Sequence, residues 1–301
     1  MMNKFIQFEL WKDCSQGCKF CFNKGQVPVN KTESCKYVLE NLKMLKEGQY
    51  DYIGIIGGEF FNGETIYHVQ PFLKILRQAY LLKPKKIFLT TSLIYDIGEY
   101  LIPALKALKN GPRITDKLVI CTSWDAKYRF HTPEQQALWT KNMLWIYNHF
   151  PEVELHVEMI LTQHLIDMVL NKELNFALFK QVFNCSLDFI EPSSGLYYTD
   201  KHACQKDIPG FFPTKASFIK FLMAIRDQID LNTFLSMDVR SNELHFYEDG
   251  CITVAKDRRN NAGVCKLKDK TRKYDIGFID SKDKMREVVV AFNELYGDVD
   301  S

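Results

Sequence analysis

The stretch FIQFELWKDCSQGCKFC, residues 5–21, determines where the fold begins and poses the first chemical question. Its first part is a short run of apolar and aromatic residues, which is typical of a β-strand. Its second part holds three cysteines, Cys14, Cys18 and Cys21, at spacings of four and three. Three thiols that directly follow a strand predict a chemical site at the carboxyl end of that strand.

The composition predicts an ordinary globular protein. The chain has 301 residues, of which 46% are hydrophobic and 25% charged, and its formal net charge of +2 indicates no particular partner. Its longest apolar runs are too short to cross a bilayer, and the N-terminus lacks the apolar region and cleavage site of a signal peptide. We therefore expect a cytoplasmic protein with no membrane partner.

The nine cysteines are unevenly placed along the chain. In a reducing compartment such clustering favours metal binding or catalysis over a framework of disulfides. The histidines form no set with metal-ligand spacing, and we find no glycine-rich loop of the phosphate-binding types. The cysteine triplet is thus the main candidate for a cofactor site.

Strand and helix patterns alternate over the first two thirds of the chain. The expected strands cover residues 4–11, 51–56, 86–91, 117–123, 153–161 and 187–191. The expected helices lie near residues 32–48, 64–82, 96–109, 133–149, 164–181 and 214–229. Six such units predict parallel pairing in an α/β fold, a partial (β/α)6 TIM-like barrel whose chemistry lies at the carboxyl ends of the strands.

The pattern changes after about residue 235. ELHFYEDGCITVA, residues 243–255, predicts a hairpin, and a polar loop and a helix near 281–296 follow. We therefore expect two units, a barrel over residues 1–232 and a small α+β C-terminal subdomain over residues 233–301.

Three cysteines suit an iron–sulfur cluster better than zinc. A structural zinc site takes four ligands, whereas a [4Fe–4S] cluster held by three thiolates leaves its fourth iron open to a ligand from outside. A structural cluster and a zinc site stay open as alternatives. Cys-x3-Cys-x2-Cys with an aromatic residue, Phe20, before the last cysteine resembles the signature of the radical S-adenosylmethionine (SAM) superfamily.

The second expected strand ends in Gly57-Gly58-Glu59. Two glycines allow a tight turn whose backbone approaches a ligand closely. The triplet resembles the Gly-Gly-Glu motif of the same superfamily, which implies that these residues bind the amino group of SAM. The superfamily usually has proline next, and this chain has Phe60, which leaves the local backbone open.

The ends of the third and fourth strands resemble the peptide-modifying branch of the superfamily. LTTSLIYD, residues 89–96, resembles its Thr-Thr-Asn-Gly-x-Leu segment, and VICTSWDAKYRFH, residues 119–131, resembles its Ser-x-Asp-Gly run followed by arginine. The SAM contacts that this resemblance implies are Thr91, Ser92, Ser123, Asp125 and Arg129. Each is weak alone, because a serine at a strand end is usually a turn residue.

The C-terminal part resembles a reduced form of the SPASM or twitch appendage. Such appendages often bind auxiliary clusters, for which Cys204, Cys251 and Cys265 are the candidates here. The spacing Cys-x13-Cys between the last two departs from the full SPASM set. Ordinary buried thiols remain the alternative.

Two further features bear on the substrate. Glu191, Tyr197 and Tyr198 follow the sixth expected strand, where they either contact substrate or form a packed loop. Residues 256–273 hold eight Lys and Arg against two Asp, which suits an acidic partner or a solvated loop. We favour the solvated loop and expect no nucleic-acid partner.

The resemblance implies a radical SAM enzyme, an oxidoreductase with a [4Fe–4S] cluster and SAM as cofactors. Such an enzyme reductively cleaves SAM to a 5′-deoxyadenosyl radical, which abstracts a hydrogen atom from the substrate, and it needs an electron donor such as flavodoxin or ferredoxin. We expect a peptide or protein side chain as substrate. The alternatives are a nucleotide or small metabolite, and a non-catalytic protein with a structural iron–sulfur or zinc site.

Overall fold

The computed structural model describes residues 5–11, 14–21, 31–61, 69–110, 113–190, 208–225, 228, 243–246, 251–255 and 275–278. For the last three of these segments it describes the backbone alone. Among the helices of these segments, none combines the length and the apolarity that a membrane span requires.

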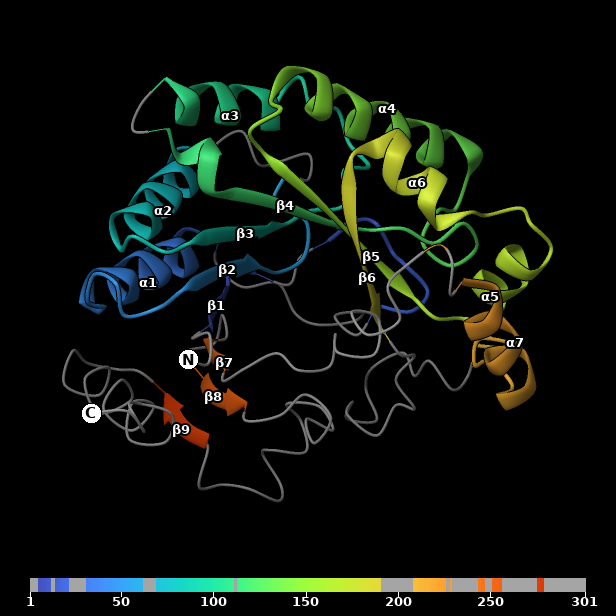
Figure 1. Ribbon diagram of the computed structural model, residues 1–301. Helices are drawn as coiled ribbons and strands as arrows, with labels where there is room; N and C mark the ends of the chain where they lie inside the picture. Colours follow the sequence, from blue (N-terminus) through green and yellow to red (C-terminus); the bar gives the residue numbers. More distant parts are fainter. Residues whose placement is uncertain are drawn as a thin grey trace.

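Six parallel strands form the centre of the fold (Figure 1). They are β1 (Phe5–Glu9), β2 (Tyr52–Ile56), β3 (Lys86–Thr90), β4 (Leu118–Ser123), β5 (Glu154–Ile160) and β6 (Cys185–Ile190). They pair in the sheet in the order β6-β5-β4-β3-β2-β1. Chain order and sheet order therefore agree, and the predicted α/β fold of the partial TIM-barrel type is confirmed.

The helices between the strands cover one face of the sheet (Figure 1). They are α1 (Lys31–Met44), α2 (Val69–Leu81), α3 (Leu101–Lys109), the 3₁₀ turn η2 (Ile114–Lys117), α4 (Pro133–His149), α5 (Gln163–Leu170) and α6 (Phe176–Phe183), and α7 (Lys215–Ile225) follows β6. Helix α4 starts as its sequence predicts, because Pro133 opens it and the Thr132 side chain accepts from the Gln135 amide.

One predicted helix was wrong. Residues 164–181 form no continuous helix but are divided between α5 and α6. Lys172 has a φ of 62°, which ends α5, and the Asn175 side chain caps α6 by accepting from the Leu178 amide at 2.9 Å. Asparagine favours such caps over helix interiors, so Asn175 is the sequence signal for this break.

Three C-terminal strands continue the same sheet. Strand β7 (Glu243–Phe246) pairs in parallel with β1, and β8 (Cys251–Ala255) and β9 (Asp275–Phe278) follow in antiparallel order. The expected hairpin is therefore present, at the free side of β1. The boundary between residues 232 and 233 stays a prediction, and the helix near 281–296 lies outside the described residues.

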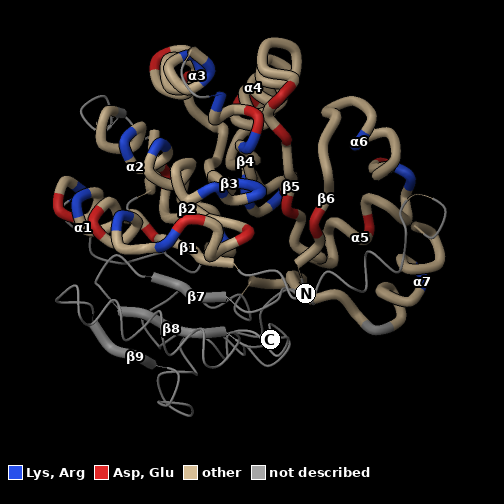
Figure 2. The backbone as a smooth tube through the Cα atoms, turned by 60° about the vertical axis from the view of Figure 1, so that its left-hand side comes forward, with Lys and Arg blue, Asp and Glu red and all other residues tan. Residues whose placement is uncertain are grey.

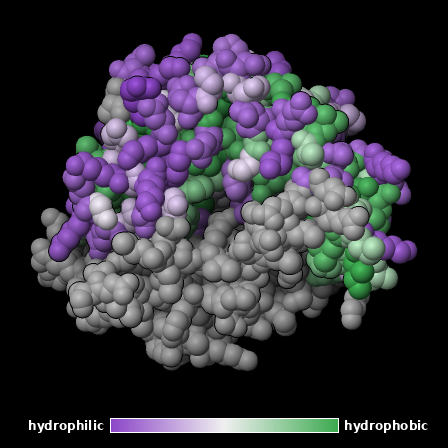
Figure 3. Space-filling model, in the orientation of Figure 1, coloured by the Kyte–Doolittle hydropathy of each residue, from purple (hydrophilic) through white to green (hydrophobic). Residues whose placement is uncertain are grey.

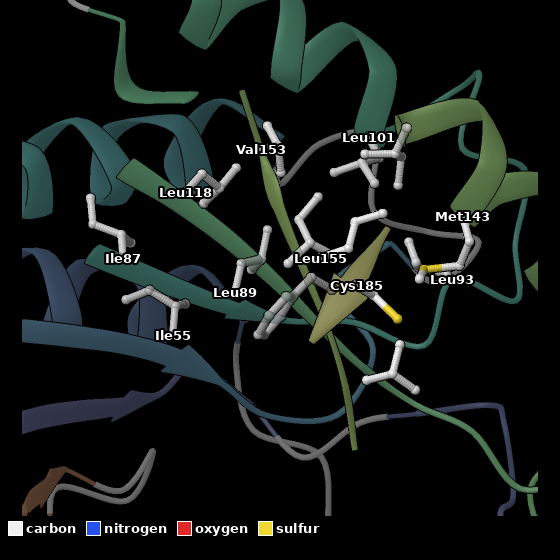
Figure 4. Close-up of a cluster of buried hydrophobic side chains, with 14 of the residues drawn as sticks. Ile55, Ile87, Leu89, Leu93, Leu101, Leu118, Met143, Val153, Leu155 and Cys185 are labelled. Atoms are coloured by element: carbon white, nitrogen blue, oxygen red, sulfur yellow. The ribbon is translucent and has the colours of Figure 1, made fainter. Parts of the chain in front are cut away.

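The two faces of the six-stranded sheet differ in polarity. Side chains that alternate along a strand point to opposite faces. On the helix side, Figure 4 shows the strand residues Ile55, Leu89 and Leu155 in one cluster of buried side chains with Leu101 of α3 and Met143 of α4. All five are buried in the hydrophobic core. Each buried leucine or isoleucine contributes about 1.5–3 kcal/mol to folding, so this side holds the sheet and helices together.

The opposite, inner face carries polar residues among the described strands. In register across β4, β5 and β6 lie Ser123, Glu158 and Asp188. Phe5 and Tyr52, the first residues of β1 and β2, form an aromatic cluster with Phe88 in the middle of β3, with ring centroids 5.8–6.4 Å apart. The inner face thus carries an aromatic cluster on β1–β3 and polar side chains at the Ser123, Glu158 and Asp188 level of β4–β6.

Charged residues of both signs are spread over the outer helices and loops (Figure 2). Figure 3 shows hydrophilic residues over most of the described surface, with apolar residues gathered near α7. There Ile219 and Met223 are among the exposed large hydrophobic residues.

Candidate functional site

The three cysteines lie in a loop at the carboxyl end of β1. Strand β1 is tied to β2 beyond its last residue, because the Leu10 amide donates to the Ile56 carbonyl at 2.9 Å. In the loop, the Cys21 amide donates to the Cys18 carbonyl at 3.1 Å, and Gly17 has a φ of 61°. Cys18 and Cys21 are thus joined by a tight backbone turn. Cys18 is buried, and Cys14 and Cys21 are half-buried.

The loop that follows β4 holds the cysteine loop in place. The Lys19 amide donates to the Tyr128 carbonyl at 2.9 Å, and the His131 Nε2 lies 2.8 Å from the Gln16 carbonyl oxygen. The Gln16 side chain also donates to the Ile94 carbonyl at 3.4 Å. Two loops that are more than a hundred residues apart in the sequence therefore build one site.

Arg129 completes this contact. It is buried, and its Nη1 lies 3.9 Å from the Cys18 Sγ, while its Nη2 donates to the Ser92 carbonyl at 3.4 Å. The resemblance implied a SAM contact for Arg129, and the structure puts its guanidinium beside one of the three thiols.

The residue types of the cysteine loop are those of an iron–sulfur site, three thiols close together in the sequence. Burial raises the pKa of Cys14 to about 12, a backbone hydrogen bond at Gln16 lowers it, and the nearby Glu59, Cys18 and Cys21 raise it further. Within the part of the chain that is described, no three His, Cys, Asp or Glu side chains lie in the arrangement of a metal site. The chemistry of three adjacent thiols is that of iron–sulfur ligands.

The turn after β2 approaches the chain beside the cysteine loop very closely. The Gly58 amide donates to the Trp11 carbonyl at 2.6 Å. Gly57 has a φ of 156°, and a Cβ added there would lie 2.3 Å from the Trp11 carbonyl oxygen. Only glycine fits at position 57 without a shift of the backbone. The glycine turn thus packs against the protein's own backbone, and its predicted approach to a ligand stays a prediction.

The Glu59 carboxylate is held by three donors. Its Oε1 accepts from the Phe61 amide at 3.1 Å and from the Thr91 hydroxyl at 2.9 Å, and its Oε2 accepts from the Ser92 amide at 2.6 Å. The side chain is 1% exposed. Glu59 therefore connects the carboxyl ends of β2 and β3, which brings the predicted residues Thr91 and Ser92 to the glycine turn.

Tyr95 extends this network and was not predicted from the sequence. Its hydroxyl lies 3.0 Å from the Thr91 Oγ1. Burial raises the pKa of Tyr95 well above its ordinary value, and the Glu59 carboxylate raises it further. Because the phenol stays protonated, it can donate to Thr91, whose own hydroxyl then donates to Glu59. The spacing of four residues between Thr91 and Tyr95 is the only sequence signal.

Asp125 holds the loop after β4. Its Oδ1 accepts from the amides of Lys127 at 2.9 Å and Tyr128 at 2.5 Å, and its Oδ2 accepts from the Thr162 hydroxyl at 3.5 Å. Burial raises the pKa of this carboxyl, and the backbone donors lower it. Ser123 ends β4 in register with Glu158. Both predicted residues therefore lie at the carboxyl end of β4.

Several predicted residues cannot be located. Cys204, Cys265, Glu191, Tyr197 and Tyr198 lie outside the described residues, as does the basic segment 256–273. Cys251 begins β8, where only the backbone is described. The auxiliary cluster and the substrate-binding rim therefore remain predictions.

A comparison with protein-family models finds no match, and a comparison with curated proteins finds none either. Solved structures do match. SuiB from Streptococcus suis, bound to S-adenosylmethionine, aligns at a TM-score of 0.56 and 12% identity over 91% of this chain and 67% of its own. A histidine-tagged form of anSMEcpe with bound AdoMet aligns at 0.60 and 14% identity over 99% and 81%. Both of these structures hold S-adenosylmethionine, and at such identities the likeness establishes a shared fold.

Proposed function

We propose that this protein is a radical SAM enzyme. The observation that carries the proposal is the assembly at one end of the sheet. There the cysteine loop after β1 lies against Arg129 and close to Glu59, in a fold shared with structures that bind S-adenosylmethionine. The carboxyl ends of parallel strands are where barrels of this type place their chemistry.

Cys14, Cys18 and Cys21 would hold a [4Fe–4S] cluster. When bound, such a cluster supplies the electron that cleaves SAM to methionine and a 5′-deoxyadenosyl radical, which takes a hydrogen atom from the substrate. The half-buried Phe20 and the buried Phe60 would help to exclude water from this site.

The chain's own residues would bind SAM. Both oxygens of the Glu59 carboxylate accept hydrogen bonds from the protein. We therefore propose that the carbonyl groups of the Gly57-Gly58 turn accept from the SAM ammonium, while Glu59 fixes the turn. The further proposed SAM contacts are Thr91, Ser92, Ser123, Asp125 and Arg129.

We propose a peptide or protein side chain as the substrate. The support is that one of the similar structures, native anSMEcpe, was solved with bound AdoMet and a Cp18Cys peptide, at a TM-score of 0.59 and 14% identity. Deuterated peptides should then transfer label into 5′-deoxyadenosine. Transfer from a nucleotide and from no peptide would overturn this choice of substrate.

Anaerobic reconstitution tests the proposed chemistry. We expect about four iron and four sulfide per chain and, after reduction, cleavage of SAM to methionine and 5′-deoxyadenosine. Cys18→Ala should abolish both. Cys35→Ala is the matched control, because Cys35 is an equally buried cysteine on α1, outside the cysteine loop. A colourless protein with one bound zinc, or full SAM cleavage by Cys18→Ala, would contradict the proposal.

A further inference from the structure

Arg129 is a buried cation with no anionic partner among the described residues. Its side chain is 7% exposed, and its Nε has no hydrogen-bond partner among the described residues. Its two other nitrogens contact one sulfur, Cys18 Sγ at 3.9 Å, and one carbonyl, that of Ser92 at 3.4 Å. Among the described ion pairs, none includes Arg129.

Burying such a group is expensive unless an anion accompanies it. A guanidinium stays protonated in proteins, so Arg129 cannot relieve the cost by losing its proton. The group that it contacts, the Cys18 thiol, becomes an anion when the thiolate binds iron. The geometry therefore suggests an arginine whose counter-charge arrives with the cofactor.

We propose that Arg129 is a positioning residue that donates a hydrogen bond to the Cys18 thiolate of the bound cluster and raises the reduction potential of that cluster. The reason is electrostatic, because reduction adds negative charge, which a nearby cation and a donor to sulfur both stabilise. This inference rests on the proposed function, since it requires that Cys18 bind the cluster.

The contact differs from a role in binding the SAM carboxylate. The protein's own fold brings the Arg129 guanidinium to Cys18, so its effect on the cluster must appear when SAM is left out. A residue that only binds the SAM carboxylate would leave the SAM-free potential unchanged. Measurements without SAM therefore separate the two roles.

The test uses the full chain, reconstituted anaerobically and poised at a series of potentials without SAM. The reduced cluster is followed by electron paramagnetic resonance. We expect Arg129→Gln to shift the midpoint potential to more negative values and to change the g-values of the signal. Arg129→Lys keeps the positive charge but loses the planar fork, so its midpoint should lie between those of Arg129→Gln and the wild type.

Lys127→Gln is the matched control. Lys127 lies in the same loop and is exposed, so the variant removes the same charge at a position where solvent and salt screen it. Its midpoint should stay close to that of the wild type. An unchanged midpoint and signal in Arg129→Gln would overturn the proposal, and so would an equal shift in Lys127→Gln. Weaker SAM binding by Arg129→Gln with an unchanged SAM-free midpoint would also overturn it.

If Arg129→Gln binds no iron, its potential cannot be measured, and the iron content of the variants after reconstitution becomes the readout. Iron content that Arg129→Lys restores would support a role of the charge at Cys18, and loss of iron in both variants would overturn that role. The proposed function is tested separately. A wild-type chain that assembles no cluster contradicts the function, whereas a loaded wild type with an unaltered Arg129→Gln contradicts only this inference.

Discussion

Glu59 and Arg129 are two buried charged residues at the same end of the sheet, and they differ in how fully the protein forms hydrogen bonds to their side chains. The Glu59 carboxylate accepts three hydrogen bonds at 2.6–3.1 Å, from two amides and one hydroxyl. The Arg129 guanidinium contacts a sulfur and a carbonyl at 3.9 and 3.4 Å, and its Nε has no hydrogen-bond partner among the described residues. The carboxylate of Glu59 is thus hydrogen-bonded within the chain, whereas no described residue supplies a counter-charge for Arg129, and we propose that the bound cluster supplies it.

The difference separates folding from cofactor binding. The turn of residues 57–59 and the strand end at Thr91 are built before any ligand arrives, so changes there should lower the stability of the cofactor-free protein. The contact between Arg129 and the cysteine loop should matter little to folding and more to the loaded protein. The predictions that follow test this division.

Gly57→Ala should have the largest effect. The added Cβ would lie 2.3 Å from the Trp11 carbonyl oxygen, at a φ of 156° that alanine rarely adopts. The Trp11 oxygen belongs to the backbone and cannot swing aside as a flexible side chain would. The chain segments after β1 and β2 must therefore move apart. We expect a loss of about 3 kcal/mol or more in the free energy of unfolding, measured by urea denaturation of the cofactor-free chain.

Gly48→Ala is the control for this variant. Gly48 also has a positive φ, of 72°, but a Cβ there would meet no atom within 4 Å. The expected loss is about 1 kcal/mol, from backbone strain alone. Equal losses in the two variants would show that the contact with Trp11 contributes nothing.

Glu59→Gln should have the next largest effect. The amide keeps one acceptor oxygen but turns its NH₂ group toward a donor, so a buried hydrogen bond is lost and two donors face each other. We expect a loss of about 2 kcal/mol in the free energy of unfolding. Glu47→Gln is the control, because Glu47 forms an exposed ion pair with Lys83, which contributes little to stability. A cofactor-free protein that tolerates both changes equally would contradict a structural role for Glu59.

Arg129→Met should act in the opposite direction. Replacing a buried cation that has no described anionic partner with an apolar side chain of similar length should stabilise the cofactor-free chain by about 1 kcal/mol. The gain should shrink after reconstitution, because the loaded cluster supplies the anion that Arg129 compensates. Thermal unfolding before and after reconstitution measures both values. A loss of stability as large as that of Glu59→Gln would mean that the cofactor-free protein stabilises the Arg129 charge as well as it stabilises the Glu59 charge.

Local patterns predicted much of the fold, and the resemblance to a known family pointed to the residues at the candidate site. Each of the six strands lies within two residues of its predicted bounds, because short apolar runs bounded by polar turns are a strong local signal. Three residues predicted to bind SAM, Thr91, Ser92 and Arg129, lie together at this edge, where they contact Glu59 or Cys18. Their contacts with SAM stay predictions. Parallel strands explain this, since their carboxyl ends meet at one edge of a sheet.

Contacts between residues far apart in the chain could not be predicted from the sequence. The pattern around Glu59 does not reveal that the partners of its carboxylate are protein donors, and Arg129 gave no sign of contact with Cys18. The pairing of β7 with β1 joins residues more than two hundred positions apart, which no local periodicity encodes. The break between α5 and α6 was overlooked for a different reason, because the apolar spacing on both sides masked the cap at Asn175.

His131→Ala should have the smallest effect, and it is confined to the cysteine loop. His131 is exposed, and its ring contacts the Gln16 carbonyl at 2.8 Å, so its loss should free the cysteine loop while global stability stays unchanged. We expect severalfold faster hydrogen exchange at the Lys19 amide, which donates to Tyr128. His149→Ala is the control, since His149 lies at the end of α4 and contacts Trp145. Faster exchange in both variants, or in neither, would show that His131 does not hold the cysteine loop against the loop after β4.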